Sequence, residues 1–353
     1  MNHASVKSLL FARYSALAKP ERSRRSITSF QRIRCIGRGA FGSVYLSRDR
    51  STGSIVALKT MDKAKLVETG RVATVWAELD VLRSARGAPA QEYLVQASSI
   101  FVDDRRLYIA MGFASGGDLM GLLIRRDVLA ASEVAYYARE LSTAIQCLHD
   151  FGFAHRDVKP DNILVFANGR VKLGDFGLAR RLKADVAFET PRNDDARMYS
   201  NVGTPDYMAP EILEGTGYSS SVDWWALGIV LIECLIGHVP FYAETPLETA
   251  TLILQFGQRR STLPWIVDDS ARDFCVRLVC PDDQRYQSAE QALRHRFLCW
   301  GASIPFVPNT KSDDDAQFFD VFEDDPQVTT RVEDVRIRTL FQSFGLSDEV
   351  STR

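Results

Sequence analysis

Two short runs in the middle of the chain carry residues whose types and order suit phosphoryl transfer. They are His155-Arg156-Asp157-Val158-Lys159-Pro160-Asp161-Asn162 and Asp175-Phe176-Gly177. Asp157 would accept or orient the proton of a substrate hydroxyl, and Lys159 would neutralise charge on the moving phosphoryl group. Asn162 and Asp175 would bind two Mg²⁺ ions, because this cation takes oxygen ligands from few carboxylates plus phosphate. The two runs therefore predict a magnesium-dependent phosphoryl-transfer centre.

A glycine-rich stretch nearer the N-terminus could close over phosphates. It reads Gly37-Arg38-Gly39-Ala40-Phe41-Gly42. The pattern alone is weak evidence, and in a dinucleotide-binding fold its third glycine opens a helix. Here an apolar run, a polar turn and a second apolar run follow, which predicts a strand–turn–strand hairpin instead. A glycine-rich hairpin that binds no ligand is the alternative.

Lys59 ends the second apolar run, Val56-Ala57-Leu58-Lys59, beneath that hairpin. It is placed to reach the α- and β-phosphates of a nucleotide, provided that an acid holds it there. Glu78 and Asp80 are the candidates, both in a helix predicted over 72–86. Apolar positions bracket Glu78 on the helix face, whereas Asp80 points further round, so we expect Glu78 to pair with Lys59.

The elements that must position these residues change in kind along the chain. Between residues 30 and 111, short β-branched or aromatic runs alternate with turns and predict strands, followed by long segments with helical periodicity. The strands are expected at Ile33–Ile36, Ser43–Ser47, Ile55–Lys59, Leu94–Val102 and Leu107–Met111. The long helices are expected at Ala131–Phe151, Val222–Ile236 and Asp269–Val279. The predicted architecture is a sheet-rich small lobe followed by a helical large lobe.

In this order, the segments resemble those of the eukaryotic protein kinases. The resemblance implies an α+β, bilobal fold with a small antiparallel β-sheet lobe and a larger helical lobe, and it implies ATP and Mg²⁺ as cofactors. Lys159 together with Thr204 resembles serine/threonine rather than tyrosine kinases. Glu211, in Ala209-Pro210-Glu211, would pair with Arg285, and Asp223 would brace the catalytic loop.

Carried over position by position, the resemblance implies three sets of site residues. The catalytic set is Asp157, Lys159, Lys59, Asn162 and Thr204. The nucleotide set is Ile36, Gly37, Arg38, Gly39, Ala40, Phe41, Gly42, Val44, Ala57, Lys59, Glu78, Met111, Phe113 and Asp118. The metal set is Asn162 and Asp175. The expected domains are a basic N-terminal regulatory segment at 1–29, a kinase domain at 30–298 with lobes at about 30–111 and 112–298, and a C-terminal tail at 299–353.

Further segments resemble the AGC group of kinases and, within it, the NDR/LATS branch. Val202–Glu211 and Pro305-Phe306-Val307-Pro308 resemble the AGC group. Leu235–Thr249, Gly116-Gly117-Asp118-Leu119-Met120 and the doublet Trp224-Trp225 resemble the NDR/LATS branch. The related ROCK/MRCK branch is the rival assignment. The alternative to an active enzyme is a pseudokinase, a scaffold protein of the same fold that binds nucleotide without transferring phosphate. Loss of Lys59, Asp157, Asn162 or Asp175 would favour it, and all four are present.

The branch resemblance also implies how the protein is regulated and what it modifies. Ser200 sits where an upstream kinase would phosphorylate the activation segment and order it through Arg156. Phe319 would pack beside the adenine, and Phe341 and Phe344 would dock back on the small lobe. The alternative for Phe341 and Phe344 is that they merely cover exposed core. Acids expected to read basic residues upstream of the target serine or threonine of a protein substrate are Asp118, Asp161 and Glu244.

The basic N-terminal segment matches the region where this branch binds a MOB-type coactivator. A transit peptide or a solvated tail is the alternative for these residues. A net charge of −2 gives no overall field that would favour nucleic acid. The six cysteines form no CxxC pair, and no apolar run approaches the ~18 residues of a membrane span. These features predict a soluble protein of the cytoplasm, the nucleus or both.

Overall fold

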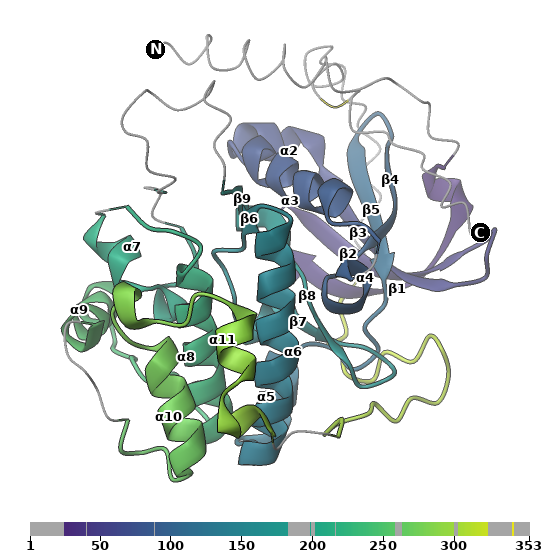
Figure 1. Cartoon of the computed structure of the whole chain (residues 1–353). Coiled ribbons are helices and arrows are strands. Elements are labelled where there is room, and N and C mark those ends of the chain that lie inside the picture. Colours follow the sequence, from purple (N-terminus) through teal and green to yellow (C-terminus); the bar gives the residue numbers. More distant parts are fainter. Residues whose placement is uncertain are drawn as a thin grey trace, which may run out of the picture. The chain divides into compact units, whose positions relative to one another are not determined.

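The computed structural model describes residues 25–39, 41–87, 89–182, 198, 202–215, 217–257, 263–299, 303–323 and 341 (Figure 1). Contacts within the chain gather in two compact units. The described parts of the first, here called the sheet unit, fall within residues 1–73, 96–113 and 310–353. The second, here called the helical unit, contains residues 74–95 and 114–309.

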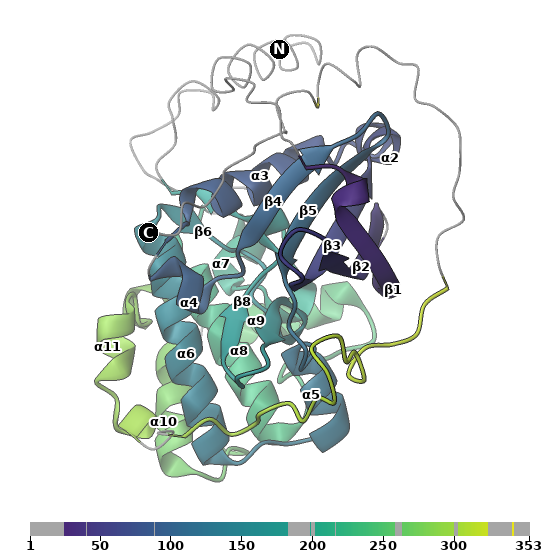
Figure 2. The same ribbon diagram turned by 90° about the vertical axis from the view of Figure 1, so that its right-hand side faces the viewer.

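One antiparallel sheet of five strands forms the body of the sheet unit (Figure 2). Its strand order is β1-β2-β3-β5-β4. The strands are β1 (Phe30–Gly39), β2 (Gly42–Asp49), β3 (Ile55–Asp62), β4 (Ala97–Val102) and β5 (Arg106–Gly112). Gly39 pairs with Gly42 across the β1–β2 turn, so the glycine-rich stretch forms the predicted hairpin rather than the start of a helix.

The two faces of this sheet carry separate apolar clusters, because successive side chains of a strand point to opposite faces. On β3, Val56 and Leu58 belong to one cluster, whereas Ile55 and Ala57 belong to the other. The Phe30 cluster comprises Phe30, Cys35, Tyr45, Val56, Leu58, Phe101, Tyr108 and Ala110, with Ile27 and Phe322 packed against it. The Ile36 cluster comprises Ile36, Leu46 and Ala316, with Val44, Ile55, Ala57, Phe113 and Phe319 packed against it.

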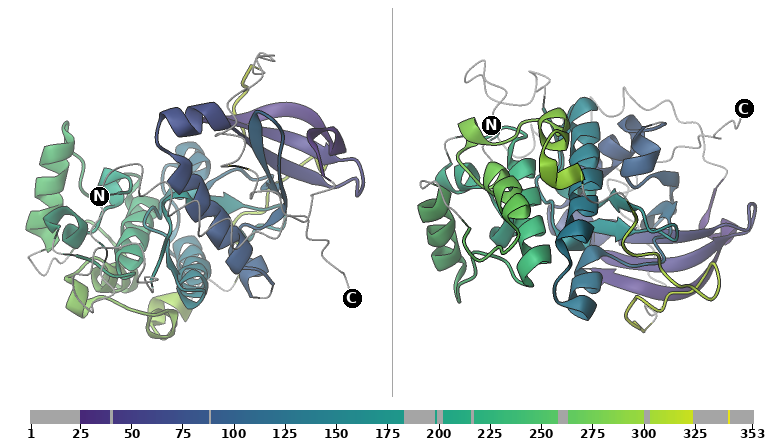
Figure 3. Two further views of the ribbon diagram at one scale, coloured as in Figure 1. Left: turned by 90° about the horizontal axis from the view of Figure 1, so that it is seen from above. Right: turned by 60° about the horizontal axis from the view of Figure 1, so that its bottom comes forward.

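Two long helices, α6 (Ala131–Asp150) and α8 (Val222–Ile236), organise the helical unit. Every residue of α8 from Val222 to Cys234 is buried, since the helix is apolar almost all round. It ends at Gly237, whose φ of 84° continues the chain in the left-handed conformation. Helix α8 lies against α6 and against α10 (Asp269–Leu278), and α11 (Ala289–Leu293) lies against α6 (Figures 1 and 3).

Among the described residues, the two units also contain shorter elements. The remaining helices are α2 (Lys63–Glu68), α3 (Val72–Ser84), α4 (Ala90–Tyr93), α5 (Leu119–Arg126), α7 (Pro210–Glu214) and α9 (Pro246–Gly257). The remaining strands are β6 (Phe153–Ala154), β7 (Ile163–Val165), β8 (Val171–Leu173) and β9 (Arg180–Arg181). Short 3₁₀ turns occur at Ile27–Ser29, Pro160–Asn162, Phe176–Leu178, Pro205–Tyr207, Asp282–Gln284 and Arg296–Cys299.

The predicted fold class is confirmed: a small antiparallel sheet is combined with a larger set of helices. Several predicted boundaries are wrong by one to three residues: β1 runs from Phe30 to Gly39 rather than from Ile33 to Ile36, and β4 begins at Ala97 rather than at Leu94. Leu94 instead caps the C-terminus of α4, donating its N–H to the carbonyl of Ala90. In the part of the chain that the structure describes, no helix combines the length and apolarity needed to cross a bilayer.

Candidate active site

A buried carboxylate, that of Asp223 on α8, fixes the backbone at the start of the catalytic loop. Its oxygens accept the N–H groups of His155 and Arg156, each at 2.8 Å, and lie 2.8 Å from Nε2 of His149. Burial by itself would raise the pKa of Asp223, but the hydrogen bonds from His149 and Arg156 outweigh it and hold the pKa below its ordinary value. Asp223 therefore stays ionised and braces the loop, as expected from the sequence.

His155 connects the catalytic loop to the segment that carries Asp175. Its Nδ1 accepts the N–H of Asp157 at 3.3 Å, so its Nε2 carries the proton and donates to the carbonyl of Gly174 at 2.9 Å. The ring also lies edge-on to Phe176, with centroids 5.6 Å apart. Because the imidazole is fully buried, these bonds set the spacing of the two segments.

Asp157 is held by donors from three other residues. Its Oδ1 accepts from the N–H and the hydroxyl of Thr204, at 3.0 and 2.9 Å. Its Oδ2 lies 3.1 Å from Nζ of Lys159 and 3.2 Å from Nδ2 of Asn162. Lys159 also donates to the Thr204 hydroxyl at 2.9 Å. The structure thus brings together four of the five residues of the predicted catalytic set.

Gly203 allows Thr204 to approach the loop this closely. Its φ is +121°, and a Cβ atom there would lie only 2.8 Å from the carbonyl oxygen of Arg156. Any larger residue would be strained and would push the two segments apart. Arg156 itself adopts a φ of 68°, which is uncommon for a residue with a side chain and marks a constrained site.

Asn162 and Asp175, the predicted metal ligands, lie at the same end of one β-hairpin. Ile163 pairs with Leu173 at the end of the β7–β8 ladder, and the N–H of Gly174 donates to the carbonyl of Asn162 at 2.9 Å. The amide nitrogen of Asn162 donates to Asp157, which leaves its oxygen as the group directed away from that residue. An amide oxygen and the exposed carboxylate of Asp175 are hard oxygen ligands that fit Mg²⁺.

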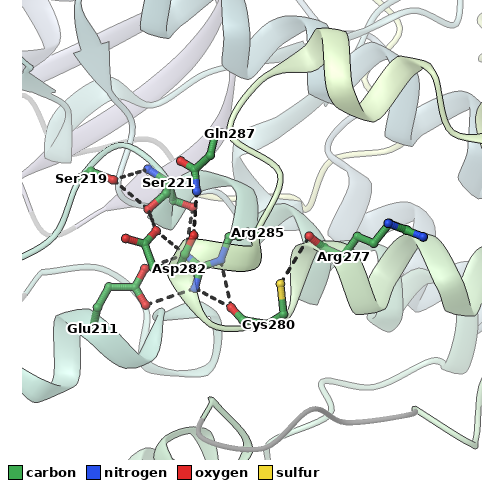
Figure 4. A network of polar contacts seen from close by, with 8 residues as sticks. All are labelled: Glu211, Ser219, Ser221, Arg277, Cys280, Asp282, Arg285 and Gln287. Atoms are coloured by element: carbon green, nitrogen blue, oxygen red, sulfur yellow. Dashed lines mark hydrogen bonds and ion pairs between the residues drawn. The ribbon is translucent and has the colours of Figure 1, made fainter.

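A network around Arg285 anchors the segment that ends at Glu211 (Figure 4). The Arg285 side chain is fully buried, and its two terminal nitrogens contact the Glu211 carboxylate at 2.5 and 3.2 Å. The same guanidinium donates to the carbonyls of Cys280 and Ser221, at 3.0 and 3.1 Å. This is the ion pair expected from the sequence, and it ties the chain after the active site to the body of the helical unit.

In the sheet unit, four residues of the predicted nucleotide set gather in the Ile36 cluster. They are Ile36, Val44, Ala57 and Phe113. Phe319 of the tail stacks on Phe113, with ring centroids 5.5 Å apart. Met111 is the β5 partner of Ala57 in the ladder. An apolar surface is thereby assembled from β1, β2, β3, the end of β5 and the tail.

The glycine-rich hairpin lies beside this cluster on β1 and β2. At Gly42 a Cβ atom would lie 1.7 Å from the carbonyl oxygen of Thr60, so only glycine fits against β3 there. Gly37 and Gly39 belong to β1, and Ala40 lies outside the described residues. The guanidinium of Arg38 donates to the carbonyl of Glu323 at 2.7 Å, and that of Arg71 lies over the ring of Phe41.

The structure also bears on the choice between Glu78 and Asp80. Asp80 forms a two-pronged ion pair with Arg181, at 2.7 and 2.8 Å, which occupies its carboxylate. Glu78 is buried, with 3% of its surface exposed. Lys59 belongs to the sheet unit and Glu78 to the helical unit, and their pairing stays a prediction. Asp118 caps the N-terminus of α5 by accepting the N–H of Gly121 at 2.7 Å.

Two functional candidates in the helical unit, Glu233 and Asp206, were missed in the sequence. Glu233 is buried on α8 and accepts the hydroxyl of Tyr207 at 2.7 Å. Burial raises the pKa of Glu233, the hydrogen bond from Tyr207 opposes this, and the nearby charges of Asp161 and Asp206 raise it further. Three carboxylates therefore share one region next to the catalytic loop. In the sequence, the only feature that could have indicated these carboxylates is the Asp206-Tyr207 pair close to Thr204.

Comparisons with known proteins agree with this geometry. The protein kinase domain family matches residues 30–298. The serine/threonine-protein kinase sax-1 of Caenorhabditis briggsae is 36% identical over 344 residues, covering 86% of this chain and 72% of its own. Tricornered of Drosophila melanogaster is 34% identical over 350 residues, covering 86% and 74%. Sid2 of Schizosaccharomyces pombe is 34% identical over 350 residues, covering 86% and 57%.

These relatives are serine/threonine kinases of the NDR/LATS branch, the branch to which the sequence motifs pointed. The chain therefore belongs to the protein kinase family, as a serine/threonine kinase of the NDR/LATS branch that uses ATP as its phosphoryl donor.

Proposed function

We propose that this kinase transfers the γ-phosphoryl group of ATP, with Mg²⁺, to serine or threonine residues that follow basic residues in a protein substrate. The observation that carries the proposal is the arrangement around Asp157. Its carboxylate is fixed by Thr204, Lys159 and Asn162, and it is 12% exposed at its side chain. A hydroxyl that approaches this carboxylate can lose its proton to it as phosphorus–oxygen bond formation begins.

Asn162 and Asp175 would hold the magnesium, which supplies positive charge to the phosphate oxygens. Within the described residues there is no cluster of three or more histidine, cysteine, aspartate or glutamate ligands, so two protein ligands plus phosphate and water are the set we propose. The chain's own contribution is to orient the hydroxyl through Asp157 and to place Lys159 beside it. Positioning and charge stabilisation account for most of the catalysis in this reaction class.

The preference for basic residues rests on the acids of the helical unit. Asp161, Asp206 and Glu233 lie close enough that the first two raise the pKa of the third. Such a cluster is repulsive in the free enzyme, and a guanidinium or ammonium group of a substrate would relieve that repulsion. Asp118 and Glu244 are the other two acids that the sequence analysis proposed for this role, together with Asp161. Asp118 also caps helix α5.

Activation by an upstream kinase at Ser200 is the regulatory part of the proposal. Ser200 lies outside the described residues, but Met198, two positions earlier, exchanges backbone hydrogen bonds with Tyr218 at 2.7 and 2.9 Å. The Tyr218 hydroxyl accepts from Arg156 at 3.0 Å. Burial and the nearby charge of Arg156 lower the pKa of Arg180. Two guanidinium groups thus lie close together near the Met198 bridge, where a phosphate would be favourable.

A MOB-type coactivator at the basic segment 1–29 is the remaining part of the proposal. It is supported by the excess of Lys and Arg over acids in that segment and by the branch to which the relatives belong. Because opposite charges favour association, we expect such a coactivator to bind this basic segment through an acidic face.

The test of substrate preference compares two serine peptides that differ only in an upstream arginine or alanine. With Mg²⁺ and labelled ATP, the wild-type kinase should show a higher kcat/KM for the arginine peptide. Glu233→Gln should lower kcat/KM for that peptide by roughly tenfold and leave the alanine peptide nearly unchanged. Glu244→Gln tests the exposed acid in the same way. Equal use of both peptides by the wild type would refute the preference without touching the kinase activity itself.

A further inference from the structure

A small cavity opens on the face of the sheet that carries the Phe30 cluster. Its volume is about 200 Å³, and its lining includes Arg32, Thr60, Asp103, Arg105, Arg106 and Tyr108. Thr60 follows Val56 and Leu58 on the same face of β3, whereas Ala57 faces the Ile36 cluster on the other side. The cavity is therefore separated by the thickness of the sheet from the surface assigned to the adenine.

Three arginines reach this cavity from two separate parts of the sheet unit. Arg105 is neutralised, because its Nε lies 2.9 Å from the carboxylate of Asp62. The guanidinium of Arg32 lies over the ring of Tyr45, 5.0 Å from its centroid, and that of Arg106 lies beside the hydroxyl of Tyr108. In the described part of the chain, neither Arg32 nor Arg106 has a carboxylate within ion-pair distance.

Asp103, the acid in the lining, is already engaged by its own turn. Its carboxylate accepts the N–H groups of Arg105 and Arg106 at 2.8 and 2.6 Å, and the hydroxyl of Tyr108 at 2.6 Å. These bonds fix the conformation of the β4–β5 turn and place the start of β5 beside the cavity. A carboxylate with these three donors is fixed in place and cannot swing over to pair with Arg32 or Arg106.

Size and charge define what the cavity can accept. A volume of about 200 Å³ is below the range of roughly 300–1,000 Å³ that is usual for sites that enclose whole small molecules. It suits one anionic group, such as a carboxylate or a phosphate, between two guanidinium forks. The lining holds three arginines, of which Asp62 neutralises Arg105, so it lacks the cluster of roughly four to eight basic residues typical of an anionic membrane site.

We propose that Arg32 and Arg106 form a clamp for a single oxyanion-bearing side chain, phosphoserine or glutamate, on a peptide segment of a protein partner. Thr60 and Tyr108 form the floor of the site, and Ile27, which packs against the Phe30 cluster, forms an apolar wall for the stem of that side chain. The site is independent of the catalytic centre and would recruit a partner or substrate to the sheet unit.

The test uses the full chain labelled with ¹⁵N, without ATP, and follows the arginine Nε–Hε signals by NMR. Arg32→Gln and Arg106→Gln assign two of these signals and remove one half of the clamp each. The probes are alanine-based peptides that contain one phosphoserine, one glutamate or one serine, together with inorganic phosphate and anionic vesicles. Arg50→Gln is the matched control, because Arg50 is an exposed arginine of the same unit and does not line the cavity.

The proposal expects the phosphoserine or glutamate peptide, but not the serine peptide, to shift both signals along one saturation curve. Each clamp variant should weaken that binding roughly 10- to 100-fold, and Arg50→Gln should not change it. The stronger of the two peptides identifies the anionic group. If Arg32→Gln unfolds through loss of its contact with Tyr45, Arg106→Gln alone decides. Shifts with vesicles or inorganic phosphate only, or binding that survives both clamp variants, would overturn the proposal.

Discussion

Asp157 receives hydrogen bonds from Thr204, Lys159 and Asn162, so its orientation is set before any substrate arrives. Such pre-organisation is what a catalytic base needs, because the protein then does not have to rearrange during the reaction. Thr204 has a specific part in it, since its hydroxyl accepts a hydrogen bond from Lys159 and donates one to Asp157. One hydroxyl therefore keeps the base and the neighbouring cation in a fixed relation.

The acids that are proposed to bind the basic residues of substrates should make the preference for arginine-containing peptides depend on pH. The pKa of Glu233 is raised above its ordinary 4.5, mainly by burial and further by Asp161 and Asp206. As pH falls from neutrality toward that raised pKa, the carboxyl takes up a proton and loses the charge that attracts arginine. The ratio of kcat/KM for the arginine and alanine peptides should therefore decline on acidification.

Glu233→Gln should show a low ratio that does not vary with pH. Taking the ratio cancels pH effects common to both peptides, such as those on the catalytic centre. A ratio that stays constant with pH in the wild type would exclude Glu233 as the reader. The raised pKa also means that the folded protein holds this proton more tightly than the unfolded chain. Ionisation of Glu233 therefore lowers stability as pH rises from 4.5 through the folded pKa.

At the scale of elements, the Glu211–Arg285 pair joins the short helix α7 to the segment between α10 and α11. Arg285 is fully buried and Glu211 nearly so, with side-chain exposures of 0% and 12%. Arg285→Ala should lower the free energy of unfolding by about 3–5 kcal/mol, because it leaves the carboxylate buried without its partner. Arg294→Ala, which removes an exposed pair with Glu290 on the surface, should change stability too little to measure.

Chemical denaturation of the two variants measures the difference directly. Equal small losses for Arg285→Ala and Arg294→Ala would mean that the network in Figure 4 does not hold α7 in place.

The tail is a second element whose contacts lead to a prediction. Arg34 on β1 donates to the carbonyls of Ala316, Phe319 and Asp320 at 3.1, 3.1 and 3.3 Å, which holds Phe319 against Phe113. If the Ile36 cluster contacts the adenine, Phe319→Ala should raise KM for ATP about two- to tenfold by removing that ring pair. Val321→Ala is the matched control, since Val321 is 87% exposed in the same tail segment. Unchanged KM in Phe319→Ala would separate the tail from the nucleotide.

For the molecule as a whole, the sequence predicts most reliably what is local. Helix α8 was predicted with its observed bounds, because apolar residues surround it and Gly237 ends it. Asp157, Lys159 and Asn162 could be assigned because they share one short loop. Helix α5 was not predicted, because its N-terminal capping residue Asp118 was interpreted as a contact to nucleotide and substrate rather than as a helix cap. Leu94 was predicted to begin a strand because the sequence pattern does not distinguish an apolar strand residue from an apolar residue that caps a helix. The structure shows that it caps α4.

Contacts that depend on distant segments were harder to predict. The role of Glu233 depends on Tyr207 and Asp161, which lie 26 and 72 positions away in the chain and meet it only through packing of the helical unit. The arginines that line the cavity come from β1, from the β4–β5 turn and from the start of β5, and no local pattern joins them. The Glu211–Arg285 and Asp223 contacts were expected only because the kinase resemblance supplied them.

The measurement that bears most directly on the central claim is phosphate transfer from labelled ATP to the arginine-containing serine peptide by the wild type and by Asp157→Ala. Both proteins are tested with Mg²⁺, after phosphorylation at Ser200 and with a MOB-type coactivator. The variant should bind nucleotide as the wild type does, yet transfer phosphate on the order of 10²–10⁴ times more slowly. Equal rates for the two proteins, or nucleotide binding without any transfer by the wild type, would contradict the assignment of Asp157 as the catalytic base.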